Sequence, residues 1–435
     1  MFGYYFKLGL RSLRRNRYLT SLMVLTLAVG VAASVSTLAI LHAMSGDPIP
    51  SKSERLFVPF LDNAQPEGYV PGAEHIDMQM TYQDATNLLR AGPGERGTAM
   101  FGTGMPIEPP RTDIPAFSGY GLAPTRDFFA MFEVPFLHGQ PWSAEDDARG
   151  ANVVVLSRAV AEKLFGDASP VGQRLRMGGE PFTVVGVLGD WNPMPRYYKL
   201  IGSGPATGED FIIPFSTAVR RELQPYGSVN CSESRDSGYA SLLSSECTWI
   251  QVWLETRAGA DRADLHAFLE NYVGEQRKLG RFKRQAPVEL YDVMEWMEQQ
   301  KVVGNDTRLS AWLAFGFLLL CLVNTVGLLL AKYSGRASEV GIRRALGASK
   351  RDIFRQFLVE TGVVGLAGGI LGLVLAFGAL ALIGMESKST AAVARMDWQM
   401  LALTFAMSIC AALVAGLLPT WRACQVTPAI QLKSQ

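Results

Sequence analysis

Four long apolar stretches constrain the fold of this 435-residue chain more than any other feature of its sequence. They cover residues 19–44, 309–331, 357–383 and 398–418, and Glu360 is the only Asp, Glu, Lys or Arg residue within them. A helix needs about 20 residues to cross the roughly 30 Å hydrocarbon core of a bilayer, so each stretch is long enough. The sequence therefore predicts an α-helical membrane protein with four transmembrane helices.

The first stretch has a second interpretation, a cleaved signal peptide, because five Lys and Arg residues precede it. Its apolar core is about twice as long as the apolar region of a typical signal peptide. Three further apolar stretches also follow it in the chain. We therefore treat residues 19–44 as a membrane helix.

The distribution of charge predicts which side of the membrane each connecting segment occupies. Residues 1–18 carry five basic residues and no acid, and residues 332–356 carry seven basic residues and two acids. Residues 45–307 instead carry 24 basic and 35 acidic residues. Short basic segments are retained in the cytoplasm, whereas long domains cross largely regardless of charge. Both termini and residues 332–356 are therefore predicted to be cytoplasmic, and residues 45–307 to lie outside.

The predicted organisation follows from these boundaries. It comprises a cytoplasmic amphipathic segment at 1–18, transmembrane helices at 19–44, 309–331, 357–383 and 398–418, an external domain with a stalk at 45–307, a cytoplasmic loop at 332–356 and a cytoplasmic tail at 419–435. The net charge of the whole chain is only +1, which excludes a globally basic protein that binds nucleic acid.

Residues 45–307 are predicted to form a large mixed α/β domain, inserted between the first and second membrane helices. Apolar and alternating patterns predict strands at 152–156, 173–177, 182–188, 248–255 and 288–290, and helices at 157–165 and 261–278. The pair Gly178-Gly179 suits the positive φ of a tight hairpin turn. The helix at 261–278 and its two flanking strands form a β-α-β unit. Segments 202–208 and 227–245 are rich in Gly and Ser and are predicted to be surface loops.

The segment after Tyr291 has two interpretations. It contains no Gly or Pro before Gly304, and its apolar residues fall on one face, which predicts a helical stalk that continues into the second membrane helix. The alternative is a short helix followed by a loop at Gly304-Asn305-Asp306, because these residues favour turns.

Two of the five cysteines, Cys231 and Cys247, lie in the predicted external domain. A pair of cysteines in an oxidising compartment favours a disulfide, which would close a loop rich in Ser and Gly. Two unpaired thiols are the alternative.

The chain contains none of the motifs that would indicate a catalytic centre. Its four histidines form no H-E-x-x-H or H-x-x-x-H arrangement, so no zinc protease site or other metal site is predicted. There is no G-x-S-x-G elbow. There is also no G-x-x-x-x-G-K-[ST] loop, so the chain is predicted to bind no ATP and to be no enzyme by itself.

Two features lie within the third apolar stretch. Glu360 is either a functional residue, as intramembrane acids often are, or a structural one that pairs with a neighbour such as Arg355. The glycines Gly365, Gly368, Gly369 and Gly372 form two overlapping G-x-x-x-G spacings, which allow helix backbones to approach closely in lipid. This packing could lie within one subunit or between two subunits.

The loop after the second stretch carries the most specific motif of the chain. Residues 339–348 have the sequence E-V-G-I-R-R-A-L-G-A, which closely resembles the E-I-G-I-R-R-A-L-G-A signature of MacB/FtsX-like ABC transporter permeases. Residues 419–433 resemble the P-A-x-R-A ending of that family, with Pro419, Arg422 and Pro428 in register. Residues 153–188 are similar to the MacB-type periplasmic core domain. The order of parts, one helix, a large external domain and three helices, is also that of the family.

This resemblance implies a transporter of the mechanotransmission type in the bacterial inner membrane. Two permeases, identical or homologous, would associate with two copies of a cytoplasmic ATPase that bind ATP and Mg²⁺. Closure of the ATPases would move the external domains. The absence of a phosphate-binding loop agrees with an ATPase on a separate chain. A periplasmic adaptor, an outer-membrane channel and membrane lipids are further expected partners.

The motif predicts where the ATPase contacts this chain. Residues 337–346 can form a helix that ends at Gly347, with Ile342, Ala345 and Leu346 as an apolar stripe and Arg343 and Arg344 facing acids of the partner. The full predicted coupling set is Glu339, Gly341, Ile342, Arg343, Arg344, Ala345, Leu346 and Gly347. The alternative is a helix whose basic residues contact anionic lipid.

The family resemblance leaves three functions open. The first is export of a peptide, an antibiotic-like compound or another amphiphile. The second is extraction of lipoproteins from the inner membrane. The third is regulation of cell-wall hydrolases without transport, as in FtsX-like permeases, but these usually have much smaller external domains.

Overall fold

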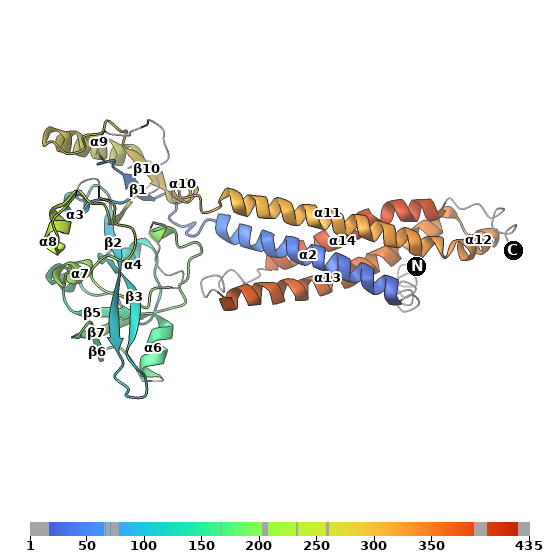
Figure 1. The fold of residues 1–435 in the computed structure, drawn as a ribbon, viewed down its shortest axis with the longest axis horizontal. Coiled ribbons are helices and arrows are strands. Elements are labelled where there is room, and N and C mark those ends of the chain that lie inside the picture. The colour runs from blue at the N-terminus through green and yellow to red at the C-terminus, as the bar shows by residue number, and fades with distance from the viewer. Residues whose placement is uncertain are drawn as a thin grey trace. The chain divides into compact units, whose positions relative to one another are not determined.

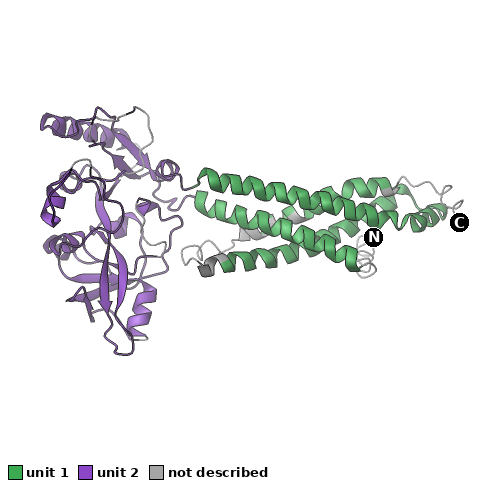
Figure 2. Cartoon of the chain, in the orientation of Figure 1, with its two compact units in different colours: residues 1–45, 303–435 green, residues 46–302 purple. Residues whose placement is uncertain are grey.

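The computed structural model describes residues 17–64, 66, 70, 78–166, 168–201, 208–231, 234–257, 261–386 and 398–424. The chain divides into two compact units (Figure 2). The helical unit contains residues 1–45 and 303–435, and the α/β unit contains residues 46–302. The predicted N-terminal segment, apart from its last two residues, and the predicted tail after Cys424 lie outside the described residues.

The helical unit consists of long apolar helices and one short polar helix (Figure 1). Its described helices are α2 (Arg17–Ser45), α11 (Asn305–Ser334), α12 (Ala337–Ala345), α13 (Lys350–Glu386) and α14 (Trp398–Cys424). α2 packs against α11 and α13, and α14 packs against the same two helices. Hydrophobic side chains around most of the circumference of α2, α11 and α13 favour a lipid environment over water.

Three of these helices are long and apolar enough to cross a membrane, at Arg17–Ser45, Asn305–Ser334 and Lys350–Leu382. In α14 the apolar helical segment found among the described residues is shorter, Ile409–Arg422. The fourth transmembrane helix therefore stays a prediction.

The α/β unit is built on one large sheet. Its described strands are β1 (Leu56–Phe60), β2 (Arg96–Glu108), β3 (Phe117–Pro124), β4 (Phe136–Gly139), β5 (Val153–Leu156), β6 (Arg174–Met177), β7 (Glu180–Leu188), β8 (Phe211–Ile212), β9 (Gln251–Glu255) and β10 (Glu289–Asp292). The strand order is β10-β1-β9-β2-β3-β8-β5-β7-β4, and β6 pairs with β2 and β7.

Short helices cover both faces of this sheet. They are α3 (Tyr82–Ala91), α4 (Phe128–Met131), α5 (Ala144–Arg149), α6 (Arg158–Phe165), α7 (Phe215–Arg220), α8 (Tyr239–Ser244), α9 (Arg262–Lys278), α10 (Val293–Gln299) and the 3-10 helix η1 (Tyr197–Lys199). In β1, Phe57 lies in one apolar core, whereas Leu56 and Val58 lie in the other. Burial of both faces explains why β1 and β5 consist entirely of apolar residues.

Several local predictions for the α/β unit are confirmed. The hydroxyl of Ser157 accepts a hydrogen bond from the Val160 backbone N–H and caps α6. Gly178 and Gly179 adopt φ values of +57° and +80° between β6 and β7. β9, α9 and β10 form the predicted β-α-β unit, but β1 lies between the two strands and pairs antiparallel with each.

Two predictions for this unit are wrong. The stalk does not form, because α10 ends at Gln299 and Lys301 adopts φ +51°, a conformation that interrupts a helix. Trp296 of α10 is fully buried in the α/β core, and α11 begins only after Gly304. The predicted loop at 227–245 also contains α8, because Tyr239 and Leu242 reach the core.

Candidate coupling site

The predicted coupling segment forms a helix that is set off from its neighbours at both ends. α11 ends at Ser334, and Arg336 is the N-cap residue of α12, with φ −109° and ψ 11°. α12 ends at Ala345, one residue before the predicted end. Gly347 then adopts φ +97°, a conformation that glycine tolerates and that stops the helix where the sequence predicts.

The two faces of α12 differ in what they contact. Val340 is buried with Leu329 and Ile353 in an apolar cluster of the helical unit, and Gly341 is buried beside it. The predicted apolar stripe lies on the other face. Ile342 is 59% exposed and Leu346 is 84% exposed, and Ala345 is exposed as well. Ile342 and Leu346 therefore leave an apolar surface on this face of α12 that is open to a partner.

The role of Arg343 in binding acids of a partner stays a prediction, and in this structure Arg343 has partners within the chain. Arg343 donates hydrogen bonds to Oε1 of Glu339 at 2.7 Å, one helical turn earlier, and to Oε1 of Gln356 at 3.0 Å. Because Gln356 belongs to α13, the second of these bonds ties α12 to α13 within the chain. Arg344 is only half-exposed. The apolar stripe is therefore the more accessible part of the segment.

Glu360 is buried at the point where three helices meet. Lys332, in the last turn of α11, places its Nζ 2.8 Å from Oε1 of Glu360. Nη1 of Arg336 donates to both carboxylate oxygens at 3.2 Å. The predicted pairing with Arg355 is wrong, because Arg355 is exposed on another face of α13. We call Lys332, Arg336 and Glu360 the ionic joint.

An aromatic contact lies beside the ionic joint. The rings of Tyr333 and Phe357 have centroids 4.3 Å apart, and the Tyr333 hydroxyl donates to the Phe357 carbonyl oxygen at 3.3 Å. The same hydroxyl lies 3.0 Å from Oγ1 of Thr361. α11 and α13 are therefore held together by packing as well as by charge.

The glycine motif of α13 packs within the chain. A Cβ atom on Gly368 would lie 3.1 Å from Cβ of Leu27, and one on Gly372 would lie 3.0 Å from the carbonyl oxygen of Ala28. Both neighbours belong to α2. Gly365 and Gly369 are buried as well. Close approach of α2 and α13 thus explains the small residues without a second subunit.

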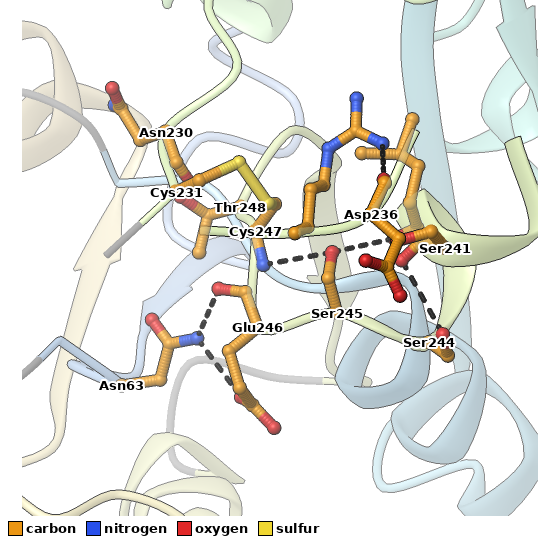
Figure 3. Close-up of a disulfide and its surroundings, with 12 residues drawn as sticks. Asn63, Asn230, Cys231, Asp236, Ser241, Ser244, Ser245, Glu246, Cys247 and Thr248 are labelled. Atoms are coloured by element: carbon orange, nitrogen blue, oxygen red, sulfur yellow. Dashed lines mark hydrogen bonds between the residues drawn. A yellow bond between two sulfur atoms is a disulfide. The ribbon is translucent and has the colours of Figure 1, made fainter. Parts of the chain in front are cut away.

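A disulfide joins Cys231 and Cys247 in the α/β unit, as the sequence predicts (Figure 3). One residue further along each segment, Asn230 and Thr248 exchange two backbone hydrogen bonds of 3.0 and 2.8 Å. Glu246, the residue before Cys247, accepts hydrogen bonds from Nδ2 of Asn63 through its carbonyl oxygen and through Oε2 of its carboxylate (Figure 3). The disulfide therefore holds a segment that carries a charged side chain into the domain.

Glu246 belongs to a second buried group of charges, which the sequence analysis missed. Arg281 donates to Oδ1 and Oδ2 of Asp84 at 2.8 and 2.6 Å, and to Oε1 and Oε2 of Glu246 at 2.6 and 3.0 Å. Burial alone would raise the pKa of Glu246, but the hydrogen bond and charge of Arg281 hold it below its ordinary value. No sequence signal joins these residues, because they lie far apart in the chain. We call Asp84, Glu246 and Arg281 the arginine cluster.

The described residues contain no group of His, Cys, Asp and Glu side chains suited to hold a metal ion. The side chains of the helical unit described above lie in contacts between helices and on the exposed face of α12.

Comparison with known proteins identifies the family. Residues 20–272 match the MacB-like periplasmic core domain, and residues 311–428 match the FtsX-like permease C-terminal domain. The macrolide export ATP-binding/permease protein MacB of Hyphomonas neptunium is 27% identical over 99% of this chain and 60% of its own length. The pyoverdine export ATP-binding/permease protein PvdT of Pseudomonas aeruginosa is 25% identical over 97% of this chain and 57% of its own length.

The chain thus spans about three fifths of the length of these two relatives. A PvdT of Pseudomonas entomophila is 27% identical over 71% of this chain and 42% of its own length. Among solved structures, the periplasmic region of MacB from Actinobacillus actinomycetemcomitans matches 59% of this chain and 96% of its own, with 12% identity and a TM-score of 0.36. The two family models cover the external domain and the C-terminal helices, and the chain belongs to the MacB/FtsX-like family of ABC transporter permeases.

Proposed function

We propose that this chain is the permease subunit of an ABC exporter in the bacterial inner membrane, with both termini in the cytoplasm. ATP and Mg²⁺ bind to a separate ATPase, present in two copies, and this chain pairs with a second permease. Movement of α12 by the ATPase is transmitted through the helices to the external α/β unit. The absence of a phosphate-binding loop in the sequence supports this division of labour.

The observation that carries the proposal is the exposed stripe of Ile342, Ala345 and Leu346 on α12. These residues lie within the most specific family motif of the chain. The lipid alternative predicts that the basic residues of α12 contact anionic headgroups. Contact with a groove of the ATPase would bury the stripe, as amphipathic helices are buried in partner grooves.

For the substrate, we propose a peptide, an antibiotic-like compound or another amphiphile. The names of the relatives support this class, since they describe proteins that export macrolides and pyoverdine. A periplasmic adaptor and an outer-membrane channel would complete the export path. The large α/β unit is the part of this chain that such partners would meet outside.

The change Leu346→Asp tests the contact with the ATPase. Because Leu346 is almost fully exposed, the change should leave the fold of the permease intact, but it should place a charge in the apolar contact. Copurification of the ATPase with the full-length chain should fall sharply. Leu279→Asp is the matched control, since Leu279 is 74% exposed in the α/β unit and should tolerate the same change.

Normal copurification with Leu346→Asp would exclude the stripe as the ATPase contact.

Wild-type chain with its ATPase should also move a fluorescent macrolide across the membrane of proteoliposomes when ATP is supplied. ATP hydrolysis that depends on the permease, but moves no peptide, antibiotic-like compound or other amphiphile, would instead favour the regulatory alternative.

A further inference from the structure

Glu360 connects three helices through one carboxylate. It lies on α13, and it binds Lys332 in the last turn of α11 and Arg336 at the start of α12. Because Arg336 is the N-cap residue of α12, it moves with the helix that carries the exposed stripe. Arg343, at the other end of α12, also reaches α13 through Gln356. α12 is thus bound to α13 at both of its ends.

The burial of the ionic joint gives it mechanical consequences. The side chain of Lys332 is 0% exposed and that of Glu360 is 4% exposed. A buried charge that loses its partner has no water to replace it, so separation of the two is strongly unfavourable. Any displacement of α12 that pulls on Arg336 therefore also pulls on Glu360, and Lys332 follows Glu360. At the ionic joint, α11, α12 and α13 are therefore expected to move together.

Adhesion alone does not require charge at this position. Apolar side chains of similar volume often hold buried surfaces together as well as an ion pair does. Tyr333 and Phe357 already supply such packing between α11 and α13. An ion pair differs because its breakage leaves buried charges without partners, which carries a large penalty. A linkage that resists separation in this way can transmit movement.

We propose that Glu360 transmits the displacement of α12 to α11 and α13, by holding Arg336 and Lys332 on one carboxylate. The inference rests on the proposed function, because it takes the ATPase to act on α12. In this proposal Arg336 passes the displacement of α12 to Glu360, and Lys332 passes it from Glu360 to α11. Glu360 and Arg336 are positioning residues, and neither needs to contact ATP or the transported compound.

Arg336→Gln is the sharpest test of this inference. It removes the link to α12 but leaves the buried pair of Lys332 and Glu360 intact, so the fold should survive. Arg355→Gln is the matched control, because it removes the same charge from an exposed position on the same cytoplasmic side. Arg336→Lys should restore part of the link.

The readout is the distance between spin labels at Leu309 and Leu382, two exposed residues towards the ends of α11 and α13 that lie away from α12. The full-length complex with its ATPase is compared in the presence and absence of ATP and vanadate, in a chain without other free cysteines. Wild type and Arg355→Gln should show an ATP-dependent change of distance. In Arg336→Gln the population of the ATP-induced distance should fall about tenfold, within the usual range of allosteric coupling.

Each outcome bears on one proposal. Loss of the distance change with normal ATPase copurification supports the inference. A full distance change in Arg336→Gln overturns it, as does a wild-type complex whose label distance ignores ATP. Loss of ATPase copurification in Arg336→Gln also overturns it, because Arg336 would then act in docking. Failure of the proposed function is seen separately, as unaltered copurification with Leu346→Asp.

Discussion

The two units of this chain each bury a group of charges, and the two groups connect different kinds of structure. In the arginine cluster, one cation lies between two carboxylates and ties the first turn of α3 to the segment after α9. In the ionic joint, one carboxylate lies between two cations and ties three helices. The first group fastens segments of one domain, and the second links elements that the proposed function requires to move.

The surroundings of the two groups sharpen this difference. Arg281 also donates to Oε1 of Gln276 at 2.8 Å, and Tyr272 donates to Asp84 at 2.6 Å. Neutral side chains therefore supply part of the hydrogen bonding in the arginine cluster. Glu246 remains about one third exposed. The ionic joint instead lies at the ends of strongly apolar helices. Replacement of one charged residue should therefore destabilise the protein more in the ionic joint than in the arginine cluster.

The largest effect is expected for Glu360→Gln, which leaves Lys332 buried without an anion. It should lower the free energy of unfolding of the helical unit by about 3 to 5 kcal/mol. The double change Lys332→Met with Glu360→Met removes both charges and should recover most of this loss. Thermal unfolding of the purified chain in detergent measures both. Equal stability of single and double variants would show that the pairing contributes little.

Arg281→Met should have the next largest effect. It leaves Asp84 and Glu246 facing each other without a cation, which should cost about 3 kcal/mol, the lower end of the same range. Lys278→Met is the control, because Lys278 forms an exposed pair with Glu275 whose contribution should be under about 1 kcal/mol. Denaturation of the α/β unit, followed by tryptophan fluorescence, compares the two. If Arg281→Met proved as mild as Lys278→Met, the cluster would not brace the domain.

These two groups also show where the sequence was informative. Local features were predictable, because Ser157, Gly178 and Gly179 act on their immediate neighbours and the motif at 339–348 ends at a glycine. The partner of Glu360 was not predictable. The helix breaks at Arg336, whose side chain reaches Glu360, whereas Arg355, although closer in sequence, lies on another face of α13.

Long-range placement was equally hidden from the sequence. β1 lies between β9 and β10, although it precedes them by about 190 and about 230 residues, because its two apolar faces complete both cores. The end of α10 depends on burial of Trp296 in one of those cores, whereas the pattern after Tyr291 alone suggests continuation. A local signal, Gly347, thus sets the end of α12, whereas tertiary packing sets the end of α10.

Removal of the disulfide tests whether the arginine cluster depends on the fixed position of the segment that carries Glu246. Replacing both Cys231 and Cys247 by Ser should destabilise the α/β unit by about 2 to 3 kcal/mol, as for other loops of this length. Arg281→Met should then cost less than it does in the wild type, because Glu246 is no longer held near Asp84. A double-mutant comparison of denaturation midpoints measures this coupling. Fully additive losses, or free thiols in the native protein under non-reducing mass spectrometry, would contradict the expectation.

A smaller effect should separate packing from charge in the helical unit. A Cβ on Gly372 meets the Ala28 carbonyl oxygen at 3.0 Å, so Gly372→Ala should cost about 1 to 2 kcal/mol through overpacking against α2. Gly378 lies on the same helix with nothing within 4 Å, so Gly378→Ala should be neutral or slightly stabilising. Thermal unfolding of the two variants gives the comparison. Equal effects would place the contact between α2 and α13 elsewhere.

The smallest effect is expected from acid, and it should act on the arginine cluster through Glu246. The pKa of this carboxyl is held below its ordinary value of 4.5 in the folded protein. The unfolded chain therefore takes up a proton first as the pH falls. The stabilisation from Glu246 is fully present above that ordinary value and is lost as the pH drops through the lower, folded value. Unfolding of the α/β unit followed between pH 7 and about pH 3 should show this loss in the wild type, because these values bracket the range in which carboxylates titrate. The loss should be smaller in Glu246→Gln, which cannot titrate at this position. A pH profile that is identical in the two proteins would show that Glu246 does not couple folding to acid.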